Sequence, residues 1–185
     1  MAELQAKHDV TLHWLPYELR PEPEPLPRMD GPDLERARGN WERGVAPLAD
    51  RYGVEMRFPP YKPRSRWAHE AAEFARDHGQ FDAMRTGLFQ TLFVANRNIG
   101  EIDVLADVAT GVGLDGAELR AALDEGRYTQ RVIELEAIAF QLGVRAVPTM
   151  VFGDTVAVEG AQPYDVLRRA IEVAEREATA EQPNG

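Results

Sequence analysis

The sequence predicts an α/β fold in which a long helical block separates two short β regions. Three observations lead to this prediction. Residues 9–17 alternate between apolar and polar side chains, which is typical of a strand, and residues 33–143 carry apolar side chains at helical spacing almost throughout. Two β-prone runs, residues 149–152 and 155–158, flank a Gly-Asp turn dipeptide. Because the helical block has apolar faces of its own, we interpret it as an insertion in an α/β core.

The composition is that of one ordinary globular domain, or of one domain with an insertion: 185 residues, of which 44% are hydrophobic. The formal net charge of -10 argues against nucleic-acid binding, because such a chain would not displace counterions from phosphates. No apolar run is long enough to span a bilayer, and no basic and then apolar leader precedes the first element. We therefore expect a cytoplasmic protein with no nucleic-acid and no membrane partner.

The absence of cysteine excludes a disulfide framework, a thiolate metal site and a thiol nucleophile in this chain. Ser65 is the only serine and lies at a helix start rather than in a nucleophile elbow, so a serine hydrolase is excluded as well. His69 and Glu73 share a helix face four residues apart, but no third ligand has matching spacing. We therefore predict neither a metal site nor a cofactor.

The chain begins with two short elements and continues as a proline-rich connector. Residues 2–8 are typical of the end of a helix, and Val10, Leu12 and Trp14 lie on one face of the strand predicted at residues 9–17. The connector that follows can form neither helix nor ladder, and we interpret it as a stiff spacer. Its prolines are Pro21, Pro23, Pro25, Pro27 and Pro32.

Start and stop signals divide the helical block. Asp33 is the expected N-cap of its first helix, which Gly44 and Pro47 are expected to divide before residues 48–52. Ser65 is the expected N-cap of a helix that ends near residues 78–79. Asp115 stands three residues before a glutamate, which is the spacing of a capping box. The later helices are predicted at residues 80–95, 101–109, 116–123 and 128–142.

Residues 111–116, Gly-Val-Gly-Leu-Asp-Gly, match the spacing of a dinucleotide-binding fingerprint. They follow a helix rather than a strand, so no strand-to-helix turn would present amides to a pyrophosphate. We predict a helix–helix loop here.

The C-terminal region combines a helix end, a Val-Pro step, a hairpin and a final helix. Gly143 can take the left-handed conformation that ends a helix, and Pro148, which has no N–H, must stand at the mouth of a strand. The local pattern alone favours an ordinary trans proline that opens a hairpin over a cis proline near a binding site. Pro163 suits the first turn of a helix over residues 163–175. Residues 178–185 are predicted to be a disordered tail.

Six motifs spread along nearly the whole chain carry a resemblance. They are Trp14-Leu15-Pro16-Tyr17-Glu18-Leu19, Ser65-Arg66-Trp67-Ala68-His69, Ala75-Arg76-Asp77-His78-Gly79, Arg97-Asn98-Ile99-Gly100, Leu142-Gly143-Val144-Arg145-Ala146-Val147-Pro148 and Gly160-Ala161-Gln162-Pro163. With them the chain resembles the DsbA-like thioredoxin family. The last motif is similar to its FrnE-like branch, which is related to the 2-hydroxychromene-2-carboxylate isomerases, rather than to the glutathione-using isomerases.

The resemblance implies a single domain over residues 1–185. Its thioredoxin-like (DsbA-type) core would comprise residues 9–17 and 148–177, with the helical insertion at residues 33–143. Family members begin with a strand, a Cys-x-x-Cys motif (a serine in the isomerases) and a helix, and this N-terminal βα unit is missing here. Either the chain is truncated or it belongs to a lineage that has lost the chemistry.

The resemblance also implies where a ligand binds. The proline of this loop is normally cis in the family, and the residue before it offers its N–H and C=O to an extended peptide or small thiol ligand. Ala146, Val147 and Pro148 are therefore the expected substrate-binding residues. Arg66, His69 and Trp14 are candidate groove residues, and no catalytic residue is assigned.

Three functions follow as hypotheses. The first is a DsbA-family thiol-disulfide oxidoreductase-like protein without redox activity, because disulfide exchange requires a thiolate that this chain lacks. The second is a non-catalytic binding or assembly module on the same fold, and the third is a glutathione-dependent isomerase. The missing strand would lie between residues 9–17 and 149–152, so we expect these strands to pair directly or a homodimer to form.

Overall fold

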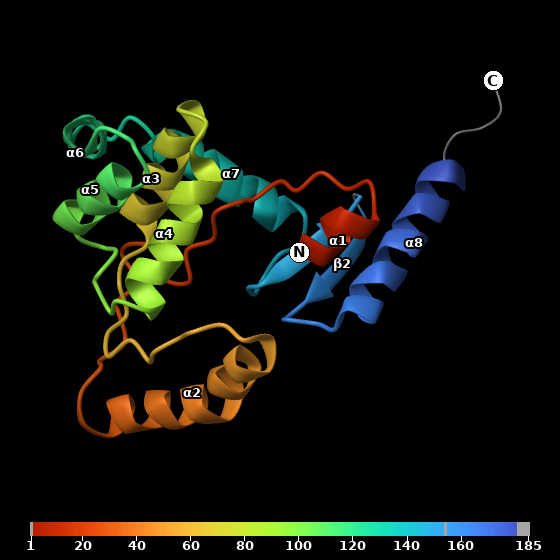
Figure 1. The fold of residues 1–185 in the computed structure, drawn as a ribbon, viewed down its shortest axis with the longest axis horizontal. Helices are drawn as coiled ribbons and strands as arrows, with labels where there is room; N and C mark the ends of the chain where they lie inside the picture. The colour runs from red at the N-terminus through yellow and green to blue at the C-terminus, as the bar shows by residue number, and fades with distance from the viewer. Residues whose placement is uncertain (1, 154, 181–185) are drawn as a thin grey trace. The chain divides into compact units, whose positions relative to one another are not determined.

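The computed structural model describes residues 2–153 and 155–180, and Figure 1 shows the order of its elements. The chain forms two compact units: unit 1 comprises Met1–Tyr17 and Leu135–Gly185, and unit 2 comprises Glu18–Glu134. Within the described residues the elements are α1 (Ala2–Lys7), α2 (Gly31–Tyr52), α3 (Arg66–Asp77), α4 (Phe81–Phe93), α5 (Ile102–Gly111), α6 (Gly116–Asp124), α7 (Thr129–Gln141), β1 (Thr149–Phe152), β2 (Val156–Glu159) and α8 (Tyr164–Ala180).

Unit 2 is helical, and its core is built around α3. Small side chains form the buried face of α3, which lets α4, α5 and α6 pack closely against it. These small residues are Ala68, Ala71, Ala72 and Ala75. The largest fully buried apolar side chains of this core are Phe74, Met84, Leu105 and Leu119. Burial of these apolar faces, more than intrinsic helix propensity, stabilises helices of this length.

The predicted helix caps have different outcomes. Asp115 caps α6 as predicted, because its Oδ1 accepts the backbone N–H groups of Ala117 at 2.8 Å and Glu118 at 3.1 Å. Ser65 stands at the predicted N-cap position of α3, but its side chain makes no capping hydrogen bond. Its backbone already has helical angles, whereas a capping side chain needs an extended N-cap residue. The predicted helix–helix loop is confirmed: residues 112–115 join Gly111, the last residue of α5, to Gly116, the first residue of α6.

The predicted division of the first helix at Gly44 and Pro47 is wrong, because α2 is one continuous helix with Pro47 inside it. A proline in a helix removes one backbone hydrogen bond, here the bond to the carbonyl of Arg43. Both residues are exposed, so water can solvate that carbonyl. The helix also begins earlier than predicted, with Asp30 rather than Asp33 at the N-cap position.

Unit 1 consists of a β-hairpin packed with α1 and α8. β1 and β2 are antiparallel, with Met150 opposite Val158 and Val151 opposite Ala157. Met150 lies on the face of the hairpin that packs against Leu4 of α1 and the apolar face of α8. The hairpin and the terminal helix confirm this part of the sequence prediction, with the second strand displaced by one residue from the predicted 155–158.

The strand predicted at residues 9–17 is wrong, because the described residues contain a sheet of two strands only. The alternation itself is present: Val10, Leu12 and Trp14 are half-buried, whereas Thr11 and His13 are exposed. Alternation decides which side chains face the protein, but a strand also needs a neighbour that accepts its hydrogen bonds. The predicted direct pairing of this segment with β1 is therefore also wrong.

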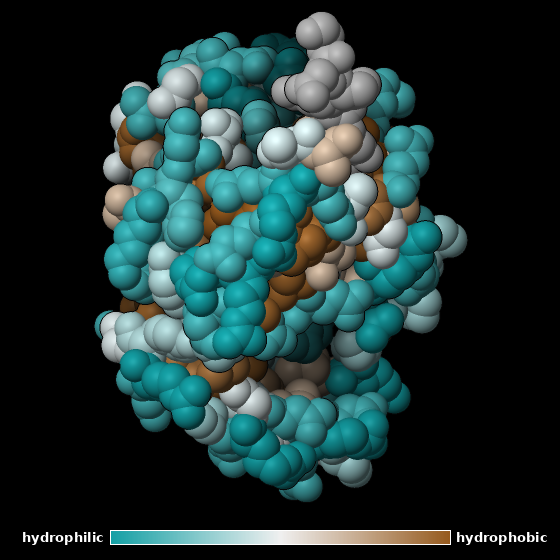
Figure 2. Space-filling view, turned by 90° about the vertical axis from the view of Figure 1, so that its right-hand side faces the viewer, coloured by the Kyte–Doolittle hydropathy of each residue, from teal (hydrophilic) through white to brown (hydrophobic). Residues whose placement is uncertain are grey.

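The C-terminal helix is longer than the sequence predicted. α8 extends to Ala180, so residues 178–180 are helical rather than disordered. Ion pairs one turn apart, such as Arg168 with Glu172, support its exposed face. The face drawn in Figure 2 is mostly hydrophilic, with hydrophobic surface confined to narrow stretches. Residues 181–185 and Asp154, the second residue of the predicted turn, lie outside the described residues. Within residues 2–153 and 155–180, no helix has the length and apolar character needed to cross a bilayer.

Candidate functional site

The loop that joins α7 to β1 is fixed at its beginning. Gly143 has a φ of 80°, the left-handed conformation that ends a helix, and Val144 is buried behind it. Nη1 of Arg145 donates hydrogen bonds to the carbonyl of Phe140 at 3.0 Å and to that of Val144 at 2.9 Å. These contacts hold the start of the loop against the end of α7.

The Val147–Pro148 peptide bond is cis, as the resemblance implied. On either side of Val147 the backbone carbonyls are occupied. The hydroxyl of Thr149 donates to the carbonyl of Ala146 at 2.7 Å, and the N–H of Gly160 donates to the carbonyl of Pro148 at 2.7 Å. The N–H and C=O of Val147 make no hydrogen bond to another described residue, and its side chain is 44% exposed. Val147 therefore presents one donor and one acceptor for a ligand.

Backbone groups along one edge of β1 extend the set begun by the N–H and C=O of Val147. Among the described residues β1 pairs with β2 alone. Residues of an antiparallel strand alternate between those that bond to the partner and those whose N–H and C=O point away. Because Pro148 bonds to β2 through Gly160, the even-numbered positions face β2. Thr149 and Val151 therefore direct their backbone groups to the open edge, which we call the β1 edge together with Val147.

The predicted groove residues lie in different units. Val147, Pro148 and the half-buried Trp14 belong to unit 1, whereas Arg66 and His69 lie on α3 of unit 2. The role of Arg66, His69 and Trp14 in a groove stays a prediction.

A buried polar cluster in unit 2 is the feature that sequence reasoning missed. Arg66 is bonded to the carboxylate of Glu18, whose side chain is 2% exposed. One turn further along α3, Glu70 is 1% exposed, and its Oε1 accepts a hydrogen bond of 2.8 Å from the hydroxyl of Thr129. Burial raises the pKa of Glu70, an effect that the Thr129 hydroxyl and the Arg66 charge partly offset. The available signal was the spacing of Glu70 one turn before the apolar Phe74 on α3.

The carboxylate considered as a metal ligand has a structural role instead. Glu73 is 3% exposed, and its Oε2 accepts a hydrogen bond of 3.0 Å from Nε of Arg76. In the described part of the chain no three His, Cys, Asp or Glu side chains are grouped so as to hold a metal ion.

Comparison with known proteins agrees with this fold. The model of the DSBA-like thioredoxin domain matches residues 1–172. The chain belongs to the DsbA-like thioredoxin family. The uncharacterized protein YwbO of Bacillus subtilis (strain 168) is 35% identical over 168 residues, which are 88% of this chain and 82% of YwbO.

Two solved structures share the fold. The probable DsbA oxidoreductase SCO1869 from Streptomyces coelicolor matches with a TM-score of 0.71 and 26% identity, and the match covers 84% of this chain and 65% of that one. A 2-hydroxychromene-2-carboxylate isomerase matches with a TM-score of 0.66 and 22% identity, over 83% of this chain and 76% of that one. This chain thus spans less than two thirds of the length of the Streptomyces protein.

Proposed function

We propose that this chain is a DsbA-family, oxidoreductase-like protein that binds an extended peptide along the β1 edge and has no redox activity of its own. The family supports the oxidoreductase side of this proposal, since a similar structure is described as a probable DsbA oxidoreductase. The absence of cysteine supports the second part, because disulfide exchange begins with attack by a thiolate. What remains is recognition, so the chain acts as a binding module of the FrnE-like branch.

The observation that carries the proposal is the continuity between Val147 and β1. Val147 has a free N–H and a free C=O, and Thr149 and Val151 follow with backbone groups that point the same way. A peptide that adds a strand to such an edge gains main-chain hydrogen bonds, and its alternate side chains then decide specificity. The exposed Ala146 and Pro148 flank the point where the peptide would enter.

Proline substitutions test the proposal, because proline removes one N–H from a strand. Val151→Pro deletes a donor on the β1 edge, whereas Ala157→Pro deletes the matched donor on the far edge of β2, opposite Val151. With an unstructured, thiol-containing peptide as ligand, we expect calorimetry to show about tenfold weaker binding for Val151→Pro, the effect of about one hydrogen bond plus the clash of the ring. Ala157→Pro should bind as the unaltered protein does. Equal effects of both variants, or no peptide binding at all, would contradict the proposal.

The redox part has its own test. The purified chain should not accelerate the reduction of insulin disulfides by a small dithiol above the uncatalysed rate. Measurable acceleration would show that the chain has redox activity despite the lack of a thiol, and this part of the proposal would fail while peptide binding could stand.

A second copy of the chain is the competing occupant of the β1 edge. The residues of β1 are Thr, Met, Val and Phe, so the strand itself has neither a charged side chain nor a proline that would prevent pairing. We propose a homodimer through this edge at high concentration. Light scattering should give a dimer mass that Val151→Pro reduces to the monomer mass and that Ala157→Pro leaves unchanged.

A further inference from the structure

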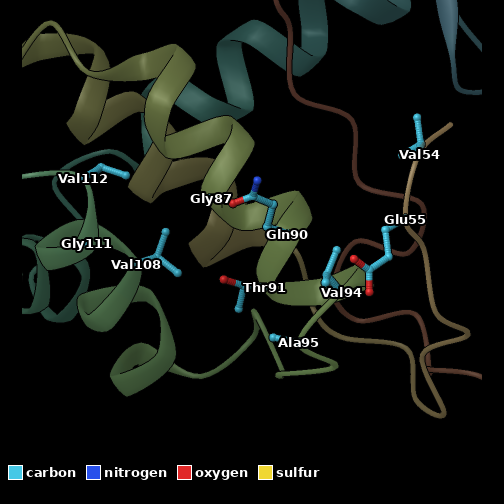
Figure 3. Close-up of a pocket in the computed structure, with 10 residues that line it drawn as sticks. All are labelled: Val54, Glu55, Gly87, Gln90, Thr91, Val94, Ala95, Val108, Gly111 and Val112. Carbon is cyan, nitrogen blue, oxygen red and sulfur yellow. The ribbon is translucent and has the colours of Figure 1, made fainter. Parts of the chain in front are cut away.

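Unit 2 contains a pocket that the proposed function does not use. Its volume is about 590 Å³, within the range of pockets that hold small molecules. Figure 3 shows three sides: residues of α4 form the floor, residues of α5 form one wall, and Val54 and Glu55 form the other wall. We call it the α4–α5 pocket.

The floor and the α5 wall follow from helical spacing. Gly87, Gln90, Thr91 and Val94 stand three and four residues apart, so they occupy one face at the end of α4. On α5, Val108, Gly111 and Val112 have the same spacing. Each helix therefore has one glycine, Gly87 on α4 and Gly111 on α5, among the residues that line the pocket.

The two glycines have different roles in this pocket. A Cβ atom on Gly87 would lie 2.9 Å from Cγ1 of Val108, so Gly87 is needed for close packing of α4 against α5. A Cβ atom on Gly111 would meet nothing within 4 Å. The space at the Cβ position of Gly111 is therefore open.

The side chains that line the pocket indicate which class of ligand it can bind. The walls are mainly aliphatic, and the side chains of Gln90 and Thr91 make no hydrogen bond to another described residue, so both can bind a ligand. The lining contains no lysine, arginine or histidine, and its one charged group, Glu55, already accepts a hydrogen bond of 3.0 Å from Arg57. An anion would find no cationic partner in the pocket, whereas a neutral molecule needs none.

We infer that the α4–α5 pocket binds a small, neutral, mainly apolar molecule with one or two hydrogen-bonding groups, which pair with Gln90 and Thr91. This site lies wholly within unit 2 and is independent of peptide binding at the β1 edge.

The test uses the full chain and the neutral fluorescent probe N-phenyl-1-naphthylamine. We expect saturable binding, which Gly111→Leu weakens at least tenfold because leucine fills the open space. Ala95→Leu, at the exposed end of the floor, is a second filling variant with the same expected loss. Gly44→Leu is the matched control, because Gly44 also lies in a helix with nothing within 4 Å of its Cβ, but outside the pocket. Circular dichroism and thermal unfolding show whether each variant is folded.

Four results would overturn the inference. The first three are no saturable binding of the probe, unchanged affinity in both folded filling variants, and a loss of affinity in Gly44→Leu as large as in the filling variants. The fourth is a molecular mass, measured by light scattering, that is lower for Gly111→Leu than for the unaltered chain. In that case the pocket would be a contact between copies of the chain rather than a small-molecule site. Loss of probe binding with unchanged peptide binding would support the inference.

Discussion

The hydroxyl of Thr129 donates a hydrogen bond of 2.8 Å to Oε1 of Glu70, a carboxyl group that is 1% exposed. This bond joins the first residue of α7 to the middle of α3. Oε2 of the same carboxyl makes no hydrogen bond to another described residue. Only one of the two carboxylate oxygens of Glu70 therefore has a hydrogen-bond partner in the described structure. When Glu70 is ionised, the other oxygen destabilises the folded state, because a buried charged atom without a partner is costly.

Glu70→Gln should make the protein more stable at neutral pH. Burial raises the pKa of Glu70 above its ordinary value of 4.5, so the folded state binds this proton more tightly than the unfolded state does. The stability that Glu70 contributes is therefore fully present below pH 4.5 and is lost as the pH rises through the raised pKa. Urea unfolding at several pH values should show that the advantage of the variant shrinks toward acidic pH. The exposed Glu35→Gln should show no such trend; a constant difference for Glu70→Gln would contradict the assignment.

Thr129→Val should destabilise the protein by about 1–3 kcal/mol, because it removes the donor to a buried carboxyl while keeping the shape of the side chain. Thr86→Val is the control, since the hydroxyl of Thr86 bonds only to the carbonyl of Asp82 on the exposed side of α4. Its free energy of unfolding should change by less than about 0.5 kcal/mol. Equal losses of unfolding free energy in the two variants would show that the bond to Glu70 stabilises the protein no more than an exposed hydrogen bond does.

Gly116→Ala should destabilise the loop between α5 and α6. A Cβ atom there would lie 2.7 Å from the carbonyl oxygen of Ala106 and 2.7 Å from the hydroxyl oxygen of Thr110. Because one of these atoms belongs to the backbone, the helices must shift, at a cost of about 1–3 kcal/mol. Gly111→Ala, five residues earlier with open space around its Cβ, should instead stabilise α5 by up to about 1 kcal/mol. Thermal unfolding of both variants checks the prediction, which fails if the signs agree.

The two N-cap positions should respond differently to alanine. Asp115→Ala removes an acceptor that two backbone N–H groups share, so unfolding should become easier by about 1 kcal/mol. Ser65→Ala should have little effect, because the Ser65 side chain makes no capping bond to α3. A loss at Ser65 as large as that at Asp115 would contradict the observed geometry.

Local patterns predicted the elements whose causes are local. The apolar spacing at residues 80–95 and 128–142 identified α4 and α7, and Asp115 identified the start of α6. The strand at residues 9–17 failed because a ladder depends on a distant partner, which periodicity cannot show. The helix break predicted at Pro47 was wrong because the cost of a proline in a helix depends on whether the carbonyl that loses its hydrogen bond is exposed. Exposure is set by the tertiary structure, which local sequence does not show.

The candidate site was only partly predictable. The position of the Val147–Pro148 loop followed from local signals in the sequence, whereas its cis bond was implied by the family resemblance and could not be derived from the local pattern. Glu70 was not predicted because most carboxylates of this acidic chain lie on solvated faces, and only packing distinguishes the buried ones. Two glycines line the α4–α5 pocket, and a sequence motif cannot show where the folded chain leaves space unfilled.

The alternation of backbone directions along β1 has a consequence for how a ligand must lie. Neighbouring positions of a strand point to opposite faces, so a peptide on this edge cannot slide by a single residue without turning every one of its side chains over. Allowed binding frames are therefore two residues apart. A ligand in which large and small side chains alternate would be held in one frame, whereas a uniform sequence would occupy several frames with similar affinity.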